Sequence, residues 1–167
     1  MRGRIHSTLG QVVLAMAALP RYQYLSLIDL KAIVVEPLIR DRLIVATHKK
    51  DDEAPSLEIG ALDNVAGIAI WASVSSEVDA RIRAQVKARV FPVKLKPEDW
   101  TSGSKDGGDH AWLLDVIAPT AKLASMVLAS FSRLVKTGEL NVHPVAARQV
   151  DADLLRKLAG DGAAEDK

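Results

Sequence analysis

The stretch Gly67-Ile-Ala-Ile-Trp-Ala-Ser-Val-Ser-Ser-Glu-Val-Asp-Ala-Arg-Ile82 decides the fold class, because its pattern changes midway from that of a strand to that of a helix. Branched and aromatic residues over 67–74 predict a strand. The serine pair 75–76 can cap a helix, and Asp79 stands three residues after the second serine, as in a capping box. The apolar residues expected on one helix face are Val78, Ile82 and Val86. A strand that leads directly into a helix indicates an α/β protein.

Outward from this stretch, strand and helix patterns alternate in both directions along the chain. The expected strands are 43–47, 67–74, 111–117 and 140–142, and the expected helices are 8–19, 76–89, 120–136 and 151–159. The type of segment 25–35 stays open, because its branched residues suit a strand and its spacing suits a helix. The pattern predicts a mixed sheet that carries helices on its faces.

Composition limits both the number of domains and the kinds of partner. The 167 residues are 49% hydrophobic and 26% charged, which predicts a single folded domain over 1–160 and a frayed tail over 161–167. The net charge of +1 disfavours a nucleic acid as partner. Cysteine is absent, so any nucleophile must be an oxygen or a nitrogen, and thiolate metal sites are excluded.

The first twenty residues have two interpretations. A basic start and the short apolar run over 12–19 are similar to a signal peptide. Alternatively, Ser7 or Thr8 caps an amphipathic helix over 8–19 that Pro20 ends, and this interpretation is favoured because Gln11 and small alanines weaken the apolar run. The favoured interpretation predicts a cytoplasmic protein. No apolar stretch reaches the length of about 18 residues that would suggest a membrane span.

Asp115 is the most unusual candidate for a catalytic residue. It lies within the apolar run Trp112-Leu-Leu-Asp-Val-Ile-Ala118, where loss of hydration would raise the pKa of its carboxyl group. A structural aspartate that pairs with a buried arginine or with backbone donors is the simpler interpretation. His110 precedes the same strand, although an exposed loop histidine is ordinary. The four histidines show no metal-ligand spacing, so no metal site is expected.

A local basic stretch begins on the helix expected over 76–89. It contains Arg81, Arg83 and Lys87, and it continues to Lys96. Such a stretch can receive an acidic protein, although most basic helix faces are merely solvated.

Four segments, read in order, resemble a known family. They are Leu9-Gly-Gln through Leu19-Pro20, then Ile70-Trp-Ala72, then Asp99-Trp-Thr-Ser-Gly103, and then Trp112-Leu-Leu-Asp-Val-Ile-Ala-Pro119. The combination resembles the toxin-activating lysine acyltransferases, which activate RTX haemolysins, over roughly residues 8 to 145. The resemblance implies a mixed sheet like that of the GCN5-related N-acetyltransferases (GNAT) and a homodimer. It also implies transfer of a fatty acyl group from acyl carrier protein, as co-substrate, to lysines of a protoxin, with no bound cofactor.

The resemblance assigns the candidate site residues and also reveals a departure. Asp115 falls on the family's catalytic aspartate, but Tyr22 occupies the position of the family's catalytic histidine, and Leu19 replaces a serine. Acyl transfer from a thioester needs a base for the lysine and an acid for the departing thiolate. Tyrosine, with a reference pKa of about 10, is a poor base near neutral pH but a plausible acid. The roles can therefore pass to Asp115 or His110 as base and Tyr22 as acid, with Arg81, Arg83 and Lys87 as the docking site for the carrier protein.

Three functions remain open at this point. The leading one is lysine acylation of a protein with acyl carrier protein as donor. The second is a catalytically lapsed relative that binds a carrier protein or a toxin, and Tyr22 is its main support. The third is acyl transfer to a small-molecule or peptide amine.

Overall fold

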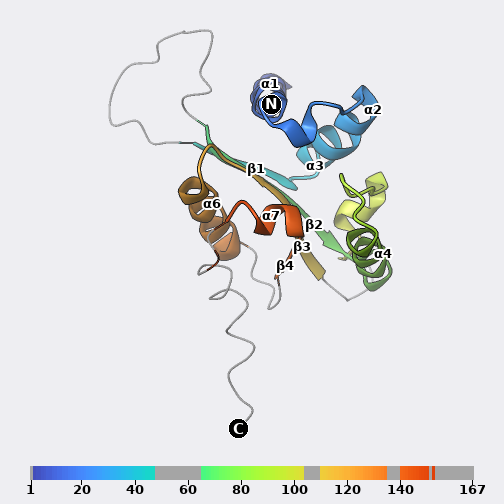
Figure 1. Cartoon of the computed structure of the whole chain (residues 1–167). Coiled ribbons are helices and arrows are strands. Elements are labelled where there is room, and N and C mark those ends of the chain that lie inside the picture. Colours follow the sequence, from blue (N-terminus) through green and yellow to red (C-terminus); the bar gives the residue numbers. More distant parts are fainter. Residues whose placement is uncertain (1, 48–64, 104–109, 135–139, 151, 153–167) are drawn as a thin grey trace, which may run out of the picture.

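The computed structural model describes residues 2–47, 65–103, 110–134, 140–150 and 152. Figure 1 shows an open sheet with the N-terminal helices on one face and α6 and α7 on the other. The order of the strands is β1-β2-β3-β4. The predicted α/β class and the mixed sheet with flanking helices are confirmed, and the arrangement is compatible with a GNAT-like fold.

All four expected strands are present. They are β1 (Leu43–Thr47), β2 (Val65–Val74), β3 (His110–Ile117) and β4 (Leu140–Val142). β1 and β3 run antiparallel to β2, whereas β4 runs parallel to β3. β2 begins two residues before the predicted start, because Val65 is also buried in the apolar core. His110 is the first residue of β3 and so does not lie in a preceding loop.

A β-bulge interrupts the pairing of β2 with β3. Ile70 pairs with Asp115, but the next pair is Trp71 with Leu113, which leaves Leu114 as the extra residue of β3. A bulge of this kind shifts the alternation of side chains and often re-aims one of them near a functional site. Leu114 and Asp115 consequently line one cavity although they are neighbours in the sequence.

The N-terminal helices cover one face of the sheet (Figure 1). α1 (Arg2–Ala17) places Val12 and Met16 in the core. It begins six residues before the predicted start, so Ser7 and Thr8 lie inside the helix and do not cap it. A 3₁₀ helix, η1 (Pro20–Tyr22), follows, as Pro20 had predicted a break.

Segment 25–35 is helical. Ser26 caps α2 (Leu27–Leu30), and the chain continues through the π-helix η2 (Lys31–Val35) into α3 (Glu36–Leu38). The wide turn precedes Pro37, whose nitrogen cannot donate a helical hydrogen bond. The buried Ile33 and Val34 explain the strand-like composition, because the helix presses them against the core.

α4 (Ser76–Lys87) and the 3₁₀ helix η4 (Pro97–Thr101) complete this face. The hydroxyl of Ser75 accepts the cap hydrogen bond from the Val78 amide. The capping box expected from Ser76 and Asp79 is therefore wrong. Asp79 instead accepts hydrogen bonds from Trp112 and Arg83, so a tertiary contact outweighs the local one.

α6 (Ala121–Leu134) and the short α7 (Pro144–Ala147) cover the opposite face. Thr120 caps α6 by accepting a hydrogen bond from the Leu123 amide. Gly67 lies beneath α6, where a Cβ atom would come within 2.6 Å of Val127 Cγ2. The expected helix 151–159 and the tail over 161–167 fall mainly or wholly outside the described residues. Within the described part of the chain, no helix is long and apolar enough to cross a membrane.

Candidate active site

Asp115 lies on the α1 side of the sheet, next to the bulge of β3. Its side chain is only 3% exposed. Its own strand supplies one hydrogen bond, because the Val116 amide donates to Asp115 Oδ1 over 2.8 Å. The surrounding strand residues are apolar, so any further compensation for the lost hydration has to come from another element.

η1 supplies that compensation. Arg21 donates from Nε and Nη2 to the two carboxylate oxygens of Asp115, over 3.2 and 3.1 Å. Its Nη2 also donates to the carbonyl oxygen of Val116 over 3.2 Å. The Tyr22 hydroxyl donates to Asp115 Oδ2. Because Pro20 starts η1 directly after α1, these two neighbouring side chains reach one carboxylate that lies over ninety positions away.

Burial has the largest effect on the pKa of this carboxyl group. It raises the pKa of Asp115 from 3.8 to about 6, although the Arg21 charge, the Arg21 hydrogen bonds and the Val116 amide all act to lower it. At neutral pH the carboxyl group is therefore mostly ionised, yet it is a much stronger base than an exposed aspartate. Such a pKa is suited to proton transfer near neutral pH.

A small cavity lies beside Tyr22 and Asp115. Its volume is about 20 Å³, and apolar side chains from several elements form most of its wall. Those side chains belong to Ile33, Ile70, Phe91, Pro92, Val93, Trp100 and Leu114. The Phe91 ring packs on Tyr22 with the ring centres 5.5 Å apart. This space has room for about one water molecule, so a long apolar ligand cannot lie in it.

His110 lies at the opposite end of β3 from Asp115. The two residues are five positions apart on the strand, which corresponds to about 16 Å. The Nε2 atom of His110 lies 3.2 Å from the Ser76 hydroxyl, and its charge acts on Asp79. The structure therefore brings Tyr22 and Asp115 together but places His110 elsewhere.

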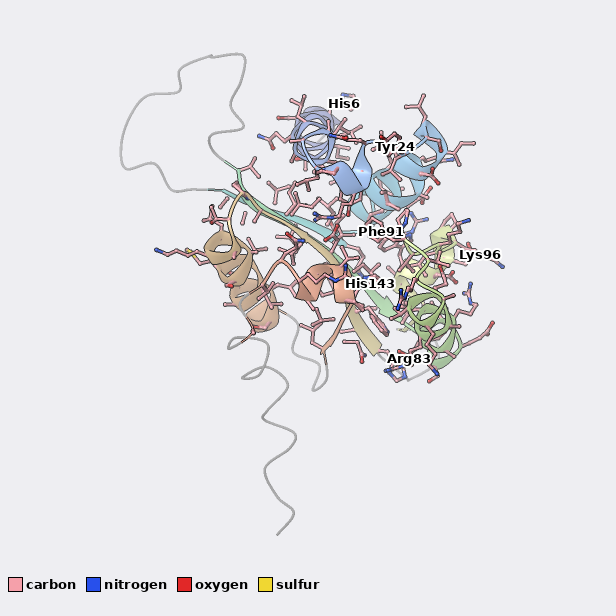
Figure 2. All side chains as sticks on the ribbon, viewed as in Figure 1. His6, Tyr24, Arg83, Phe91, Lys96 and His143 are labelled. Carbon is pink, nitrogen blue, oxygen red and sulfur yellow. The ribbon has the colours of Figure 1, made fainter. Side chains whose placement is uncertain are left out.

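The three basic residues expected to bind the carrier protein differ in their surroundings. Arg81 forms an ion pair with Asp99 over 2.7 Å, and Arg83 forms one with Asp79 over 2.9 Å. Lys87 is exposed in the last turn of α4. Figure 2 shows Arg83 at the outer side of α4, away from Phe91 in the interior. Two of the three are thus engaged within the protein.

Arg21 is the site residue that the sequence did not single out. The sequence indicated that a structural Asp115 would pair with a buried arginine, but it did not identify which arginine. Sequence reasoning has no means of choosing one arginine among many when the two partners lie 94 positions apart. Within the described residues, no group of three or more potential metal ligands occurs, so nothing in this part of the chain suggests a metal centre.

The mixed sheet, its bulge and the buried carboxylate between an arginine and a tyrosine define an α/β protein whose architecture is compatible with a GNAT-like fold. The RTX toxin acyltransferase family matches residues 2–148, so the chain belongs to that family and is classed with acyltransferases. The resemblance identified from the sequence is confirmed. No curated protein matches the chain.

Proposed function

We propose that this protein transfers a fatty acyl group from acyl carrier protein to a lysine side chain of a protein substrate, an RTX-type protoxin. One observation carries the proposal: Tyr22 and Asp115, which correspond to the family's two catalytic positions, share a hydrogen bond in a buried site. Family membership supports the acyl transfer itself. The donor and the acceptor follow from the resemblance to the toxin-activating enzymes.

In the proposed reaction, the lysine nitrogen attacks the thioester carbonyl carbon, a C–N bond forms and the C–S bond breaks. Asp115 takes the proton from the attacking amine, directly or through one water in the small cavity. The Tyr22 hydroxyl gives its proton to the departing thiolate. The hydrogen bond between the two side chains then carries the proton from Asp115 to the tyrosine oxygen, which restores both groups.

Arg21 is suited to stabilise the oxygen that becomes negative during this attack. Its Nε and Nη2 atoms hold Asp115, and its Nη1 atom donates no hydrogen bond to any residue that the structure describes. The side chain is 20% exposed, so one edge of the guanidinium reaches the surface. A fixed positive donor at the position of developing charge is an effective form of catalysis.

The exposed residues Lys87, Arg89 and Lys94 are the sharper candidates for docking the acidic carrier protein. Arg83 is less suitable for a test, because its replacement also breaks the contacts with Asp79 and Asn141. We expect Lys87→Glu combined with Arg89→Glu to weaken carrier-protein binding in titrations at low salt. Unchanged binding would identify this surface as merely solvated.

The deciding experiment is transfer of labelled acyl groups from acyl carrier protein to a lysine-containing protoxin fragment. Three proteins are compared: the natural protein, Tyr22→Phe and Tyr22→His. The proposal expects activity in the natural protein and a loss of about 10²-fold in Tyr22→Phe, which retains the ring but not the proton. Activity that appears only in Tyr22→His would show that the natural sequence has lost catalysis.

A catalytically lapsed binding module is the second candidate, because the site is almost closed. Tyr22 and Asp115 are only 6% and 2% exposed, and the adjoining cavity holds little more than a water molecule. Carrier-protein or toxin binding without acyl transfer in any of the three proteins would favour it. Transfer to a small amine but not to the protoxin would favour the third function.

Two further properties remain part of the proposal. The family resemblance suggests a homodimer, which sedimentation of the purified protein would test. A cytoplasmic location fits a reaction that draws on acyl carrier protein, itself a cytoplasmic protein. Fractionation of cells would test that location.

A further inference from the structure

An apolar groove lies between the end of α1 and the sheet, with a volume of about 220 Å³. All ten residues that line it are apolar, glycine or proline. They are Leu14, Ala15, Ala18, Leu19, Val65, Gly67, Ile68, Ile117, Ala118 and Pro119. The groove therefore offers almost no polar group to a ligand and suits a hydrocarbon.

The groove adjoins the candidate active site on the same face of the sheet. Ile117, in its floor, follows Asp115 by two residues, which is about 7 Å along β3. The two side chains share this face, because alternate strand residues point the same way. On the other wall, Leu19 precedes Arg21 by two residues.

Arg21 lines neither space, but it contacts residues next to both. Its Nη2 atom contacts the Asp115 carboxylate and also the carbonyl oxygen of Val116, which directly precedes Ile117. A thioester carbonyl beside Arg21 would thus have the buried carboxylate on one side and the apolar groove on the other. The cavity at Tyr22, at about 20 Å³, is too small to take the acyl chain itself.

We infer that this groove binds the hydrocarbon chain of the acyl donor and limits its length. The inference rests on the proposed function and adds to it the location of the acyl group. The chain lies along Ile68 and Ile117 under the end of α1, with its thioester next to Arg21. Ala18, an exposed residue in the groove wall, controls how far the chain can extend.

The test compares Ala18→Phe with Ala17→Phe over a series of acyl carrier proteins loaded with saturated chains of increasing length. Ala17 is also exposed and directly precedes Ala18, but it does not line the groove, so it is the matched control. We expect Ala18→Phe to lower kcat/KM for the longest chains by 10-fold or more and to leave short chains within about twofold, since each methylene in such a pocket counts for about 10-fold or more. Ala17→Phe should retain the natural profile.

The outcomes separate this inference from the proposed function. Activity in all three proteins with the same chain-length profile would overturn the groove and leave the function intact. If the natural protein transfers no acyl group, the proposed function fails, and displacement of a fluorescent long-chain fatty acid still tests the groove. Binding that Ala18→Phe weakens and Ala17→Phe does not would support it. A change of oligomeric state in Ala18→Phe without a change of profile would identify the groove as an interface between two copies and overturn the inference.

Discussion

Two buried aspartates, Asp79 and Asp115, have similar partners and opposite properties. Each pairs with an arginine, and each accepts a hydrogen bond from an aromatic side chain, Trp112 in one case and Tyr22 in the other. Burial raises the pKa of Asp79, but hydrogen bonds from Arg83 and Trp112 and the nearby charges outweigh it, so this pKa lies below 3.8. The pKa of Asp115 rises to about 6.

The difference comes from water rather than from the partners. The side chain of Asp115 is 3% exposed and that of its arginine 20%, whereas the values for Asp79 and Arg83 are 12% and 52%. Near the surface, the solvent and the partners together stabilise the carboxylate, and the residue acts as a structural support. Beneath the N-terminal helices, an equivalent ion pair only partly replaces the lost hydration, which leaves a carboxylate suited to accept a proton.

The largest effect should come from Asp115→Asn, which retains the shape of the side chain but removes its capacity to take the proton. We expect kcat/KM for acyl transfer to fall by about 10²-fold or more. His110→Ala, on the same strand but about 16 Å away, is the control and should change the rate little. Steady-state rates on folded protein measure both, and near-normal activity in Asp115→Asn would remove the carboxylate from the reaction.

The second effect concerns stability against pH. Between about pH 4 and pH 6 the folded protein retains the Asp115 proton that the unfolded chain releases, because the folded pKa is the higher one. The stabilisation from this group is complete below 3.8 and is lost as pH rises through about 6, by about 3 kcal/mol. Asp79 has the opposite sign, and its contribution is lost only as pH falls below 3.8.

Urea unfolding at a series of pH values measures this change. The free energy of unfolding should fall between about pH 4 and pH 7 in the natural protein, and the fall should be absent in Asp115→Asn. An identical pH profile in the two proteins would mean that Asp115 has an ordinary pKa, and the contrast with Asp79 would disappear.

The smallest effect should follow Asp79→Ala. The substitution leaves the buried Trp112 indole N–H without its acceptor, so the free energy of unfolding should fall by about 1–3 kcal/mol. Activity per folded molecule should stay unchanged, because the site contains neither residue. Chemical denaturation and the acyl-transfer assay, carried out on one preparation, test both statements. A loss of rate in fully folded Asp79→Ala would show that the two networks are coupled.

The sequence was sufficient for the elements whose signal is local. The strands 43–47 and 140–142 agree with the structure, and in 43–47 a run of branched residues specifies a strand without reference to distant parts. Segment 25–35 could not be assigned, since its composition records burial against the core as much as helix formation. Helix α1 begins before the serine and threonine that were expected to cap it, and a cap residue inside a helix has no distinctive pattern.

The candidate site was predictable in part. The family motifs identified Asp115 and Tyr22, and the structure brings the two together. The role of Arg21 and the separation of His110 depend on how η1 docks against β3, and this long-range packing leaves no periodic trace in the sequence. The ion pair between Arg81 and Asp99 could not be predicted either, because a run of charged residues has the same sequence pattern whether its side chains are paired or free.

The bulge at Leu114 determines on which side of the sheet the Asp115 side chain lies. The α6 side of β3 contains Leu113 and Val116, and the α1 side contains Trp112, Asp115 and Ile117. The extra residue Leu114 therefore reverses the alternation of side chains between the two sides of the sheet. If the same residues formed a regular strand without the bulge, the carboxylate would turn into the opposite layer and leave Arg21 and Tyr22 without a partner, although the motif itself would be unchanged. The bulge is thus as necessary to the site as the aspartate itself.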